Sequence, residues 1–307
     1  MGKIALAVHG GAGTILRSQM TPDLEREYRN GLENALQAGW AILSGGGSSL
    51  DVVEAAVALL EDFPLFNAGR GSVFTHEGEQ EMDASIMDGS SLNAGAVAFV
   101  KNIKNPVKLA RLVMEQTDHV LLAGEGANQF AEQVGVETAL DEYFFTEHRW
   151  LQLQEALADG RIQLDHAAAK PMGTVGAVAC DVNGHLAAAT STGGMTNKSF
   201  GRVGDTPLIG AGTYADDVCA VSCTGHGEYF MLGVTAYDVA ARIKYRGLSL
   251  DAAARETIAR LTEIKGEGGL IAVDARGNVT VPFNSDGMYR GYVGADGIVK
   301  VDIYGQI

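Results

Sequence analysis

The chain has 307 residues, with 38 acidic and 23 basic side chains and a formal net charge of −15. This charge argues against nucleic acid or an anionic membrane surface as a partner, because both bind basic patches. Hydrophobic residues make up 46% and charged residues 20%, an ordinary mix for a globular protein with a large core. The 40 glycines occur in clusters, which indicates tight turns and close backbone approaches.

The cysteines and the amino-terminal segment indicate in which cellular compartment the protein is expected. Cys180, Cys219 and Cys223 form no zinc-binding pattern and stand among apolar or small residues, which favours buried, reduced thiols. The apolar stretch at 1–8 is too short for a signal peptide, and no apolar run reaches the roughly 20 residues that span a bilayer. We therefore expect a cytoplasmic protein.

The first 64 residues predict one strand and two helices. The apolar run at 4–8 is typical of a buried strand, and the glycines of 9–13 indicate a tight turn after it. Thr21 and Pro22 are typical of a helix start, with a threonine cap and a proline in the first turn. A second helix is expected from Ser48, which opens a capping-box pattern.

The next hundred residues combine short strands with helical segments. We expect strands at 72–75, 81–87, 95–100 and 119–122, and helical segments at 107–114 and from 125 to about 160. Residues 160–173 are polar and contain Pro171, so they are interpreted as a linker.

Beyond the linker, strands and helices come in blocks. Strands are expected at 175–180, 185–189, 207–210, 218–222, 270–273, 279–281 and 299–304, and helices at 228–245 and 250–264. Because the two kinds of element do not alternate strictly, the order favours an α+β fold. We expect an antiparallel-rich sheet with helices outside it.

Thr174 follows the linker directly and could carry catalytic chemistry. If the chain is cut between Gly173 and Thr174, the new amino-terminal residue holds a hydroxyl nucleophile and an α-amine that can act as its base. A free α-amine has a pKa of roughly 7.7–8.0, close to the best value for a general base at neutral pH. The alternative is that Thr174 simply begins a buried strand, which suits threonine.

The glycine cluster at 9–13 does not match a dinucleotide-binding loop. Leu16 stands where that fingerprint needs a third glycine, and the next helix waits until Pro22. The cluster therefore indicates a close backbone approach. His9 is either a catalytic group or a hydrogen-bonded core histidine.

Two further loops could bind substrate. The segment from Thr224 to Glu228 lies between a predicted strand and a helix, where exposed amides can hold an anion or an oxyanion. Arg202 and Asp205 share a glycine-rich loop and could bind the carboxylate and the ammonium of an amino acid. The alternative is that Arg202 and Asp205 pair with each other on the surface.

Seven motifs in order resemble the plant-type asparaginase/isoaspartyl peptidase family of N-terminal nucleophile hydrolases. They are HGGAG at 9–13, LFNAGRG at 65–71, MDASIMDG at 82–89, GTVGAVA at 173–179, ATSTGGMTNK at 189–198, GRVGD at 201–205 and CTGHGE at 223–228. The resemblance implies a four-layer αββα sandwich. It also implies self-cleavage into an α subunit of 1–173 and a β subunit of 174–307, with a dimer of αβ units as the active form.

The resemblance also implies the reaction. The amino-terminal threonine attacks the side-chain amide of L-asparagine or the β-linked bond of an isoaspartyl dipeptide, and water then hydrolyses the aspartyl ester. Thr174 would be the nucleophile, with Thr192 as its hydroxyl neighbour and Asn67 beside it. Thr224 and Gly225 would line the oxyanion hole.

The same resemblance supplies the remaining site residues. Arg202 would hold the substrate α-carboxylate and Asp205 the α-amine, with Val203, Gly204, His226 and Gly227 completing the binding site. No cofactor is implied for the chemistry. A structural sodium ion is implied in the loop after the second helix, at Leu60, Glu61, Phe63, Phe66, Ala68 and Arg70. The linker is short for the family, which bears on the rate of self-cleavage and not on its position.

Overall fold

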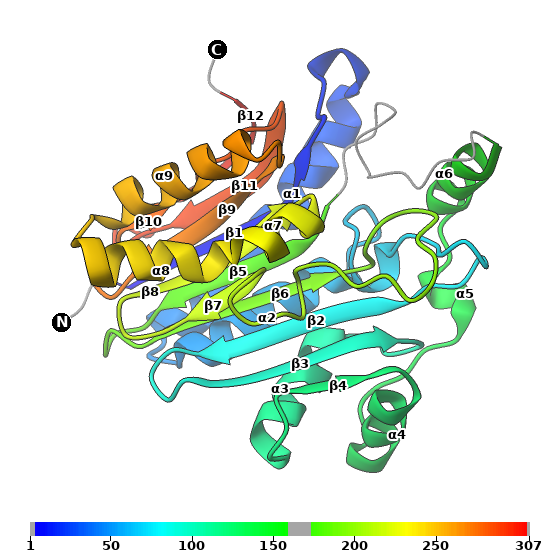
Figure 1. The fold of residues 1–307 in the computed structure, drawn as a ribbon, viewed down its shortest axis with the longest axis horizontal. Coiled ribbons are helices and arrows are strands. Elements are labelled where there is room, and N and C mark those ends of the chain that lie inside the picture. The colour runs from blue at the N-terminus through cyan, green and yellow to red at the C-terminus, as the bar shows by residue number, and fades with distance from the viewer. Residues whose placement is uncertain (1–3, 159–172, 306–307) are drawn as a thin grey trace.

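The computed structural model describes residues 4–158 and 173–305, so nearly all of the predicted linker lies outside the described residues. Two sheets lie face to face between two layers of helices (Figure 1). Three helices cover the outer face of the larger sheet, namely α1 (Pro22–Ser44), α2 (Ser49–Asp62) and α3 (Pro106–Gln116). Two helices cover the smaller sheet, namely α8 (Thr235–Arg246) and α9 (Leu250–Glu263). The predicted α+β sandwich of four layers is confirmed.

The larger sheet has eight strands and interleaves the two halves of the chain. Its order is β12 (Val299–Tyr304), β11 (Gly287–Val293), β1 (Ala5–Gly13), β5 (Val175–Cys180), β6 (Leu186–Thr192), β2 (Met82–Asp88), β3 (Asn93–Val100) and β4 (Leu121–Ala123). Neighbouring strands are antiparallel except β3 and β4. Because β1 pairs with β5, residues before and after Thr174 build one sheet.

The smaller sheet has four strands, all from beyond residue 174. Its order is β10 (Val279–Thr280), β9 (Gly268–Asp274), β8 (Cys219–Gly225) and β7 (Thr213–Ala215). The remaining helices are α4 (Gly124–Val134), α5 (Asp141–Phe144), α6 (Glu147–Ala158) and α7 (Gly227–Gly233), with single turns η1 (Arg17–Gln19) and η2 (Gly69–Gly71). No helix in the described ranges combines the length and the apolar character needed to cross a membrane.

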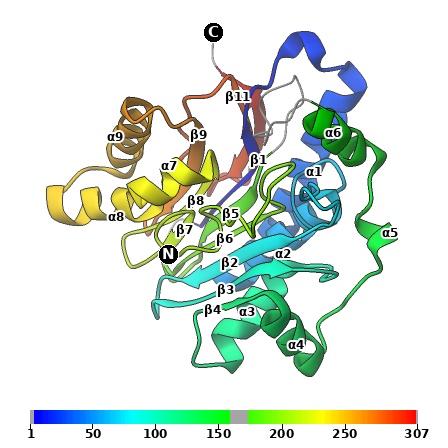
Figure 2. The same ribbon diagram turned by 45° about the vertical axis from the view of Figure 1, so that its right-hand side comes forward.

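Three separate apolar cores hold the four layers together. One lies between the larger sheet and helices α1 to α3, and another lies between the smaller sheet and helices α8 and α9. The third lies between the two sheets and is rich in alanine. Figure 2 shows the two helical layers on opposite sides of the sheets. Small side chains let the sheets approach closely, so groups from β1, β5, β6 and β8 can meet in one place.

Both predicted helix starts are confirmed. The hydroxyl of Thr21 accepts a hydrogen bond from the amide of Leu24, and Pro22 is the first residue of α1. The hydroxyl of Ser48 accepts from the amide of Asp51 and donates to its carboxylate. These bonds satisfy amides that a helix start leaves without partners.

Several predicted elements are wrong. The glycine segment 9–13 forms no tight turn, because β1 continues to Gly13 with a bulge between His9 and Gly11. Segments 72–75 and 207–210 are loops with single bridges, since each meets only an isolated partner residue.

Two predicted helical segments are interrupted, and two strands, β7 and β11, were missed. The helical pattern at 228–245 breaks into α7 and α8 at Val234, whose φ is +46°. The pattern from 125 onward divides into α4, α5 and α6. The strand β11 was missed because its glycines and its aromatic and charged residues hide a continuous buried strand.

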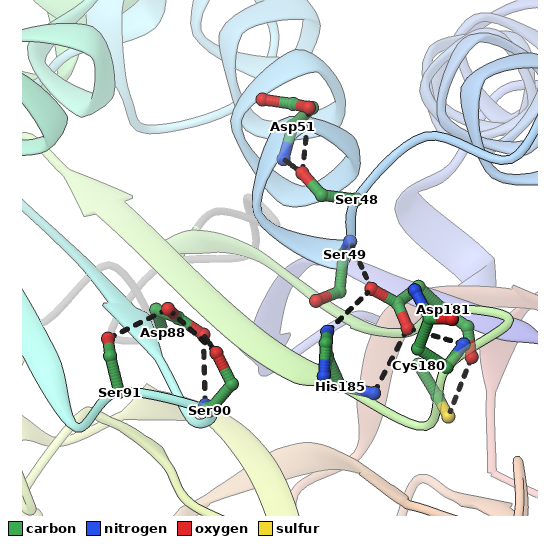
Figure 3. A network of polar contacts seen from close by, with 10 residues as sticks. Ser48, Ser49, Asp51, Asp88, Ser90, Ser91, Cys180, Asp181 and His185 are labelled. Carbon is green, nitrogen blue, oxygen red and sulfur yellow. Dashed lines mark hydrogen bonds and ion pairs between the residues drawn. The ribbon is translucent and has the colours of Figure 1, made fainter.

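The turn between β5 and β6 fixes the register that matters for the site. One carboxylate oxygen of Asp181 accepts from the amides of Asn183 and His185 at 2.9 and 3.0 Å, and the other accepts from the amide of Ser49 at 3.4 Å (Figure 3). This ties the turn to the start of α2. The register pairs Val175 with Ser191. At the opposite end of the hairpin, Thr174 therefore stands beside the last residue of β6.

Candidate active site

Two threonine hydroxyls meet where β5 begins and β6 ends. The hydroxyl of Thr174 donates to that of Thr192 at 3.1 Å, and the amide of Gly194 donates to the same Thr192 oxygen at 3.0 Å. The two threonines are only 8% and 3% exposed. Strand register and the turn after β6 thus hold the predicted nucleophile against its predicted neighbour.

The predicted cleavage point lies against the glycine segment of β1. Gly11 has a φ of +115°, and a Cβ at this position would come within 2.6 Å of the nitrogen and Cα of Gly173. A Cβ at Gly173 would in turn lie 3.1 Å from the hydroxyl oxygen of Thr224. That oxygen accepts a hydrogen bond from the amide of Ala12 at 3.3 Å. The close approach predicted for the glycine cluster is therefore an approach to the Gly173–Thr174 peptide.

Arg202 does not pair with Asp205, as the surface alternative required. Its Nε and Nη2 donate to the two carboxylate oxygens of Glu228, each at 2.9 Å. This is a bidentate, charge-assisted pair. Burial alone would raise the pKa of the Glu228 carboxyl, but the hydrogen bonds and charge of Arg202 outweigh it and lower that pKa.

Asp205 is buried and lacks a full set of partners. It is 4% exposed, and its Oδ2 has no hydrogen-bond partner in the structure. Burial raises the pKa of its carboxyl to about 7, although the nearby charge of Arg202 acts in the opposite direction. A buried carboxylate without a donor is costly, so this position is suited to receive an ammonium group.

A small pocket of about 250 Å³ joins these groups. Its lining is Thr174, Thr192, Gly194, Met195, Arg202, Gly204, Asp205, Thr206, Gly225 and Gly227. Both predicted threonines and both predicted charged groups therefore face one space. Of the other predicted residues in the described chain, Gly204, Gly225 and Gly227 line the pocket, whereas Val203, Thr224 and His226 are outside this lining.

Gly204 leaves room for the side chain of Arg202, and Gly227 leaves room for that of Asp205. A Cβ at Gly204 would lie 3.0 Å from Nη1 of Arg202, and one at Gly227 would lie 2.9 Å from Oδ1 of Asp205. Both distances are shorter than ordinary carbon contacts, so these positions favour glycine. His226 precedes Gly227 in the sequence. Its Nε2 lies 3.3 Å from a carboxylate oxygen of Glu228.

Asn67 contacts the turn after Thr192. Its side-chain amide donates to the carbonyl of Gly194 at 2.7 Å, and its Oδ1 accepts from the amide of Val73 at 3.1 Å. Its own carbonyl accepts from the amide of Gly193. Asn67 thus holds the turn whose Gly194 amide contacts Thr192, one step removed from the nucleophile.

His9 is a buried, neutral core histidine. Burial lowers the pKa of its ring to about 3, against an opposing interaction with the backbone of Thr174. Its Nε2 lies 2.9 Å from the hydroxyl of Ser222. The structure therefore favours the alternative in which His9 is hydrogen-bonded within the core.

His9 begins a chain of buried hydroxyls that the sequence interpretation missed. From Ser222 the contacts run to Thr190 at 2.7 Å, on to Thr213 at 2.5 Å, and then to Ser85 at 2.8 Å. Hydroxyl pairs two residues apart, as in Thr190 with Thr192 on β6, share one face of a strand. From the sequence, this spacing could have predicted that hydroxyl groups gather between the two sheets near Thr192.

The loop between α2 and η2 packs several carbonyl oxygens against Gly69 and Gly71. A Cβ at Gly71 would lie 1.9 Å from the carbonyl oxygen of Phe66 and 2.7 Å from that of Pro64, and one at Gly69 would lie 2.4 Å from that of Glu61. Carbonyl oxygens that accept one hydrogen bond keep a second lone pair. Oxygen donors of this kind suit a hard cation, so the donor type in this loop is compatible with the predicted ion.

The side chains of that loop have other contacts. One carboxylate oxygen of Glu61 accepts from the amide of Val107 at 3.0 Å, and burial raises the pKa of this carboxyl to about 8. The guanidinium of Arg70 lies 5.4 Å from the ring centre of Tyr143. The backbone, and not these side chains, would therefore supply the ligands.

A larger hollow elsewhere is a weaker candidate. It has about 1360 Å³ of empty space next to the turn between α8 and α9. The hydroxyl of Ser249 on its wall accepts from the amide of Ala252 and caps α9. The small pocket at Thr174 combines a paired hydroxyl, a guanidinium and a carboxylate, which suits attack on an amide of a zwitterionic amino acid.

Comparison with known proteins identifies the family of this chain. A family model described as asparaginase matches residues 2–303. The isoaspartyl peptidase of Escherichia coli is 53% identical over 303 residues, which cover 96% of this chain and 94% of the relative. The probable isoaspartyl peptidase/L-asparaginase 2 of Arabidopsis thaliana is 43% identical, over 99% of this chain and 100% of the relative. The isoaspartyl peptidase/L-asparaginase of Bos taurus is 45% identical, over 92% and 91%. The chain therefore belongs to the asparaginase family of N-terminal nucleophile hydrolases.

Proposed function

We propose that this protein hydrolyses the side-chain amide of L-asparagine and the β-linked bond of isoaspartyl dipeptides. The observation that carries the proposal is one pocket lined by the Thr174–Thr192 hydroxyl pair, Arg202 and Asp205. The names of the relatives point to the same substrates. Both substrates present the same aspartyl half to the charged groups, so one site serves both.

The first step is self-cleavage. The hydroxyl oxygen of Thr174 attacks the carbonyl carbon of Gly173, and the C–N bond breaks as the acyl group moves from nitrogen to oxygen. Water then hydrolyses this ester, which leaves a carboxylate on Gly173 and a free α-amine on Thr174. Glycine at position 173 supports the proposal, because it lets the peptide take conformations closed to other residues.

The second step uses the amine that cleavage releases. The α-amine accepts the hydroxyl proton as Thr174 attacks the β-carbonyl carbon, and the leaving ammonia or amino acid takes a proton. The aspartyl ester that remains is hydrolysed by water to L-aspartate. Thr192 supports the hydroxyl, while Thr224 and Gly225 are proposed to stabilise the oxyanion.

The charged groups would orient the aspartyl half. Arg202 binds the α-carboxylate and Asp205 the α-ammonium, with Val203, Gly204, His226 and Gly227 shaping their surroundings. The burial of Asp205 and its place in the pocket lining support this role.

The proposal also covers the oligomeric state of the protein and its cellular compartment. We expect a dimer of αβ units, each made of residues 1–173 and 174–307. The three buried, unpaired cysteines support the expected cytoplasmic location, since a reducing compartment keeps thiols free. Size-exclusion chromatography with light scattering measures the assembly, and a mass of one αβ unit would contradict the dimer.

We also propose a structural sodium ion in the loop after α2. The carbonyl groups of Leu60, Glu61, Phe63, Phe66, Ala68 and Arg70 are its proposed ligands. When bound, the ion would neutralise the repulsion between these oxygens and keep Asn67 in place. Replacing sodium chloride with choline chloride at equal ionic strength should lower the melting temperature, and an unchanged value would contradict the ion.

The main experiment combines mass analysis with substrate hydrolysis. After purification, we expect two bands of about 18 and 14 kDa by residue counting, with threonine at the amino terminus of the smaller one. The processed protein should release ammonia from L-asparagine and leucine from β-Asp-Leu. A single chain that persists through long incubation, or a processed protein inactive on both substrates, would contradict the proposal.

A further inference from the structure

We propose that Glu228 is a positioning residue for the substrate α-carboxylate. It holds Arg202 from outside the pocket, so that the free edge of the guanidinium faces the space where substrate binds. This inference rests on the proposed function, because it assigns a partner to the arginine of that site. It also assigns a role to a residue that the sequence interpretation placed only at the end of a glycine-rich loop.

The hydrogen-bond geometry separates two edges of the guanidinium. An arginine side chain offers five N–H donors in a fixed plane. Glu228 takes one from Nε and one from Nη2, each at 2.9 Å. Both donors of Nη1 and the second donor of Nη2 are then left on the other edge. That edge can donate two hydrogen bonds to a second carboxylate, in the bidentate manner typical of arginine.

The neighbours of Nη1 show which way this edge faces. A Cβ at Gly204 would lie 3.0 Å from Nη1, and one at Gly194 would lie 3.7 Å from it. Both glycines line the pocket, together with Arg202 itself. Glu228 does not belong to that lining, and it holds the Nε edge of the guanidinium and not the Nη1 edge. The two carboxylates would therefore use different edges of one guanidinium.

The exposure and length of the Arg202 side chain explain why it benefits from such a partner. The buried ammonium of Lys198 repels the guanidinium, while Asp83 attracts it from within the protein. The side chain of Arg202 is 19% exposed and that of Glu228 is 42% exposed. Without Glu228, the long arginine side chain would sample more rotamers, and each binding event would have to order it again. The fixed pair removes most of that entropic cost before substrate arrives.

Two other roles for Glu228 predict different effects of its removal on substrate binding. If the substrate carboxylate needed the Nε edge, Glu228 would have to leave, and its removal would tighten binding. If Glu228 served only the stability of α7, its removal would weaken the enzyme equally on every substrate. The direction and the substrate dependence of the effect therefore separate the three roles.

The test compares Glu228→Gln with Glu256→Gln. Glu256 is a matched control, because its side chain is 43% exposed and also pairs with arginines, Arg242 and Arg246, on the outer helical layer. Steady-state kinetics on L-asparagine form the first arm. In the second, L-asparaginamide, whose α-carboxylate is replaced by a neutral amide, is measured as a competitor. Self-cleavage to two chains reports that each variant has folded.

We expect Glu228→Gln to raise KM for L-asparagine by about tenfold with kcat changed less than about twofold, in keeping with the strength of a charge-assisted pair. Its inhibition constant for L-asparaginamide should stay within about twofold of the wild type, because that ligand lacks the carboxylate. Glu256→Gln should match the wild type in both arms.

Three results would overturn the inference. They are an unchanged KM, a lower KM for L-asparagine, or an equal loss of affinity for both compounds. Failure of the proposed function looks different, since the wild type and Glu256→Gln would then be inactive on L-asparagine as well.

Discussion

The nucleophile centre and the substrate-binding charges are built in different ways. Thr174 and Thr192 stand at the ends of two paired strands, and strand register brings their hydroxyls to 3.1 Å. Arg202 and Asp205 lie in the segment 193–212, which contains turns and single bridges and no regular strand or helix. An ion pair with Glu228 and the burial of the Asp205 carboxylate determine their positions.

The difference separates chemistry from recognition. A hairpin held in a central sheet cannot shift one side chain without moving its neighbours, so it suits a reaction that depends on fractions of an ångström. A loop that holds buried charges by ion pairing and burial is sensitive to protonation. Changes at the nucleophile centre should therefore act on kcat, and changes at the charged groups should act on KM.

The largest expected effect is that of Thr174→Ala. Without the hydroxyl the chain should stay uncut, and hydrolysis of β-Asp-Leu should fall roughly 10⁴-fold or more, because nucleophile and base are both lost. Gel electrophoresis and leucine release measure the two effects. Thr174→Ser is the control and should keep measurable cleavage and activity. Retained hydrolysis by the uncut alanine variant would rule out Thr174 as the nucleophile.

The second effect tests the hydroxyl neighbour. Thr192→Val keeps the shape of the side chain and removes the acceptor for the Thr174 hydroxyl, so kcat should fall roughly 10²-fold with KM within about threefold. Thr257→Val is a matched control on α9, since Thr257 is equally buried, 3% exposed, and donates to Asp238 at 3.1 Å. Equal losses in the two variants would show that Thr192 serves packing alone.

The third effect is a pH dependence of recognition. Burial raises the pKa of Asp205 to about 7 in the free protein, and only its ionised form attracts the substrate ammonium. As the pH falls through 7, kcat/KM should therefore drop because of lost binding. In the complex the ammonium stabilises the carboxylate, so this limb should be absent from kcat. Asp205→Asn should lower kcat/KM and abolish the limb, and an unchanged limb in that variant would assign it to another group.

The smallest effect concerns stability. The folded chain binds a proton at Asp205 more tightly than the unfolded chain, whose aspartate has a pKa near 3.8. Between about pH 4 and 7 the unfolded chain releases this proton first, so the contribution of Asp205 to stability falls as pH rises. In the uncut Thr174→Ala background, Asp205→Asn should raise the melting temperature by roughly 2–6 °C at pH 7.5 and little at pH 4. An equal change at both pH values would contradict the buried charge.

Some elements could be predicted from the local sequence and others could not. Helix starts at Thr21 and Ser48 could be predicted, because caps depend on residues three positions apart. Loops at 72–75 and 207–210 looked like strands, because period-two patterns do not show whether a pairing partner is present. The break at Val234 was also beyond reach, since a positive φ at a β-branched residue is imposed by its surroundings.

The sequence by itself determined the residue types of the site, the helix caps, the strand character around Thr174 and, through seven ordered motifs, the family. Only the tertiary structure decided the distances. It placed Gly11 against Gly173, paired Arg202 with Glu228 instead of Asp205, and linked His9 to Ser222 across the sheets. These contacts join residues far apart in the chain, so they depend on register, layer packing and burial, and local patterns do not contain that information.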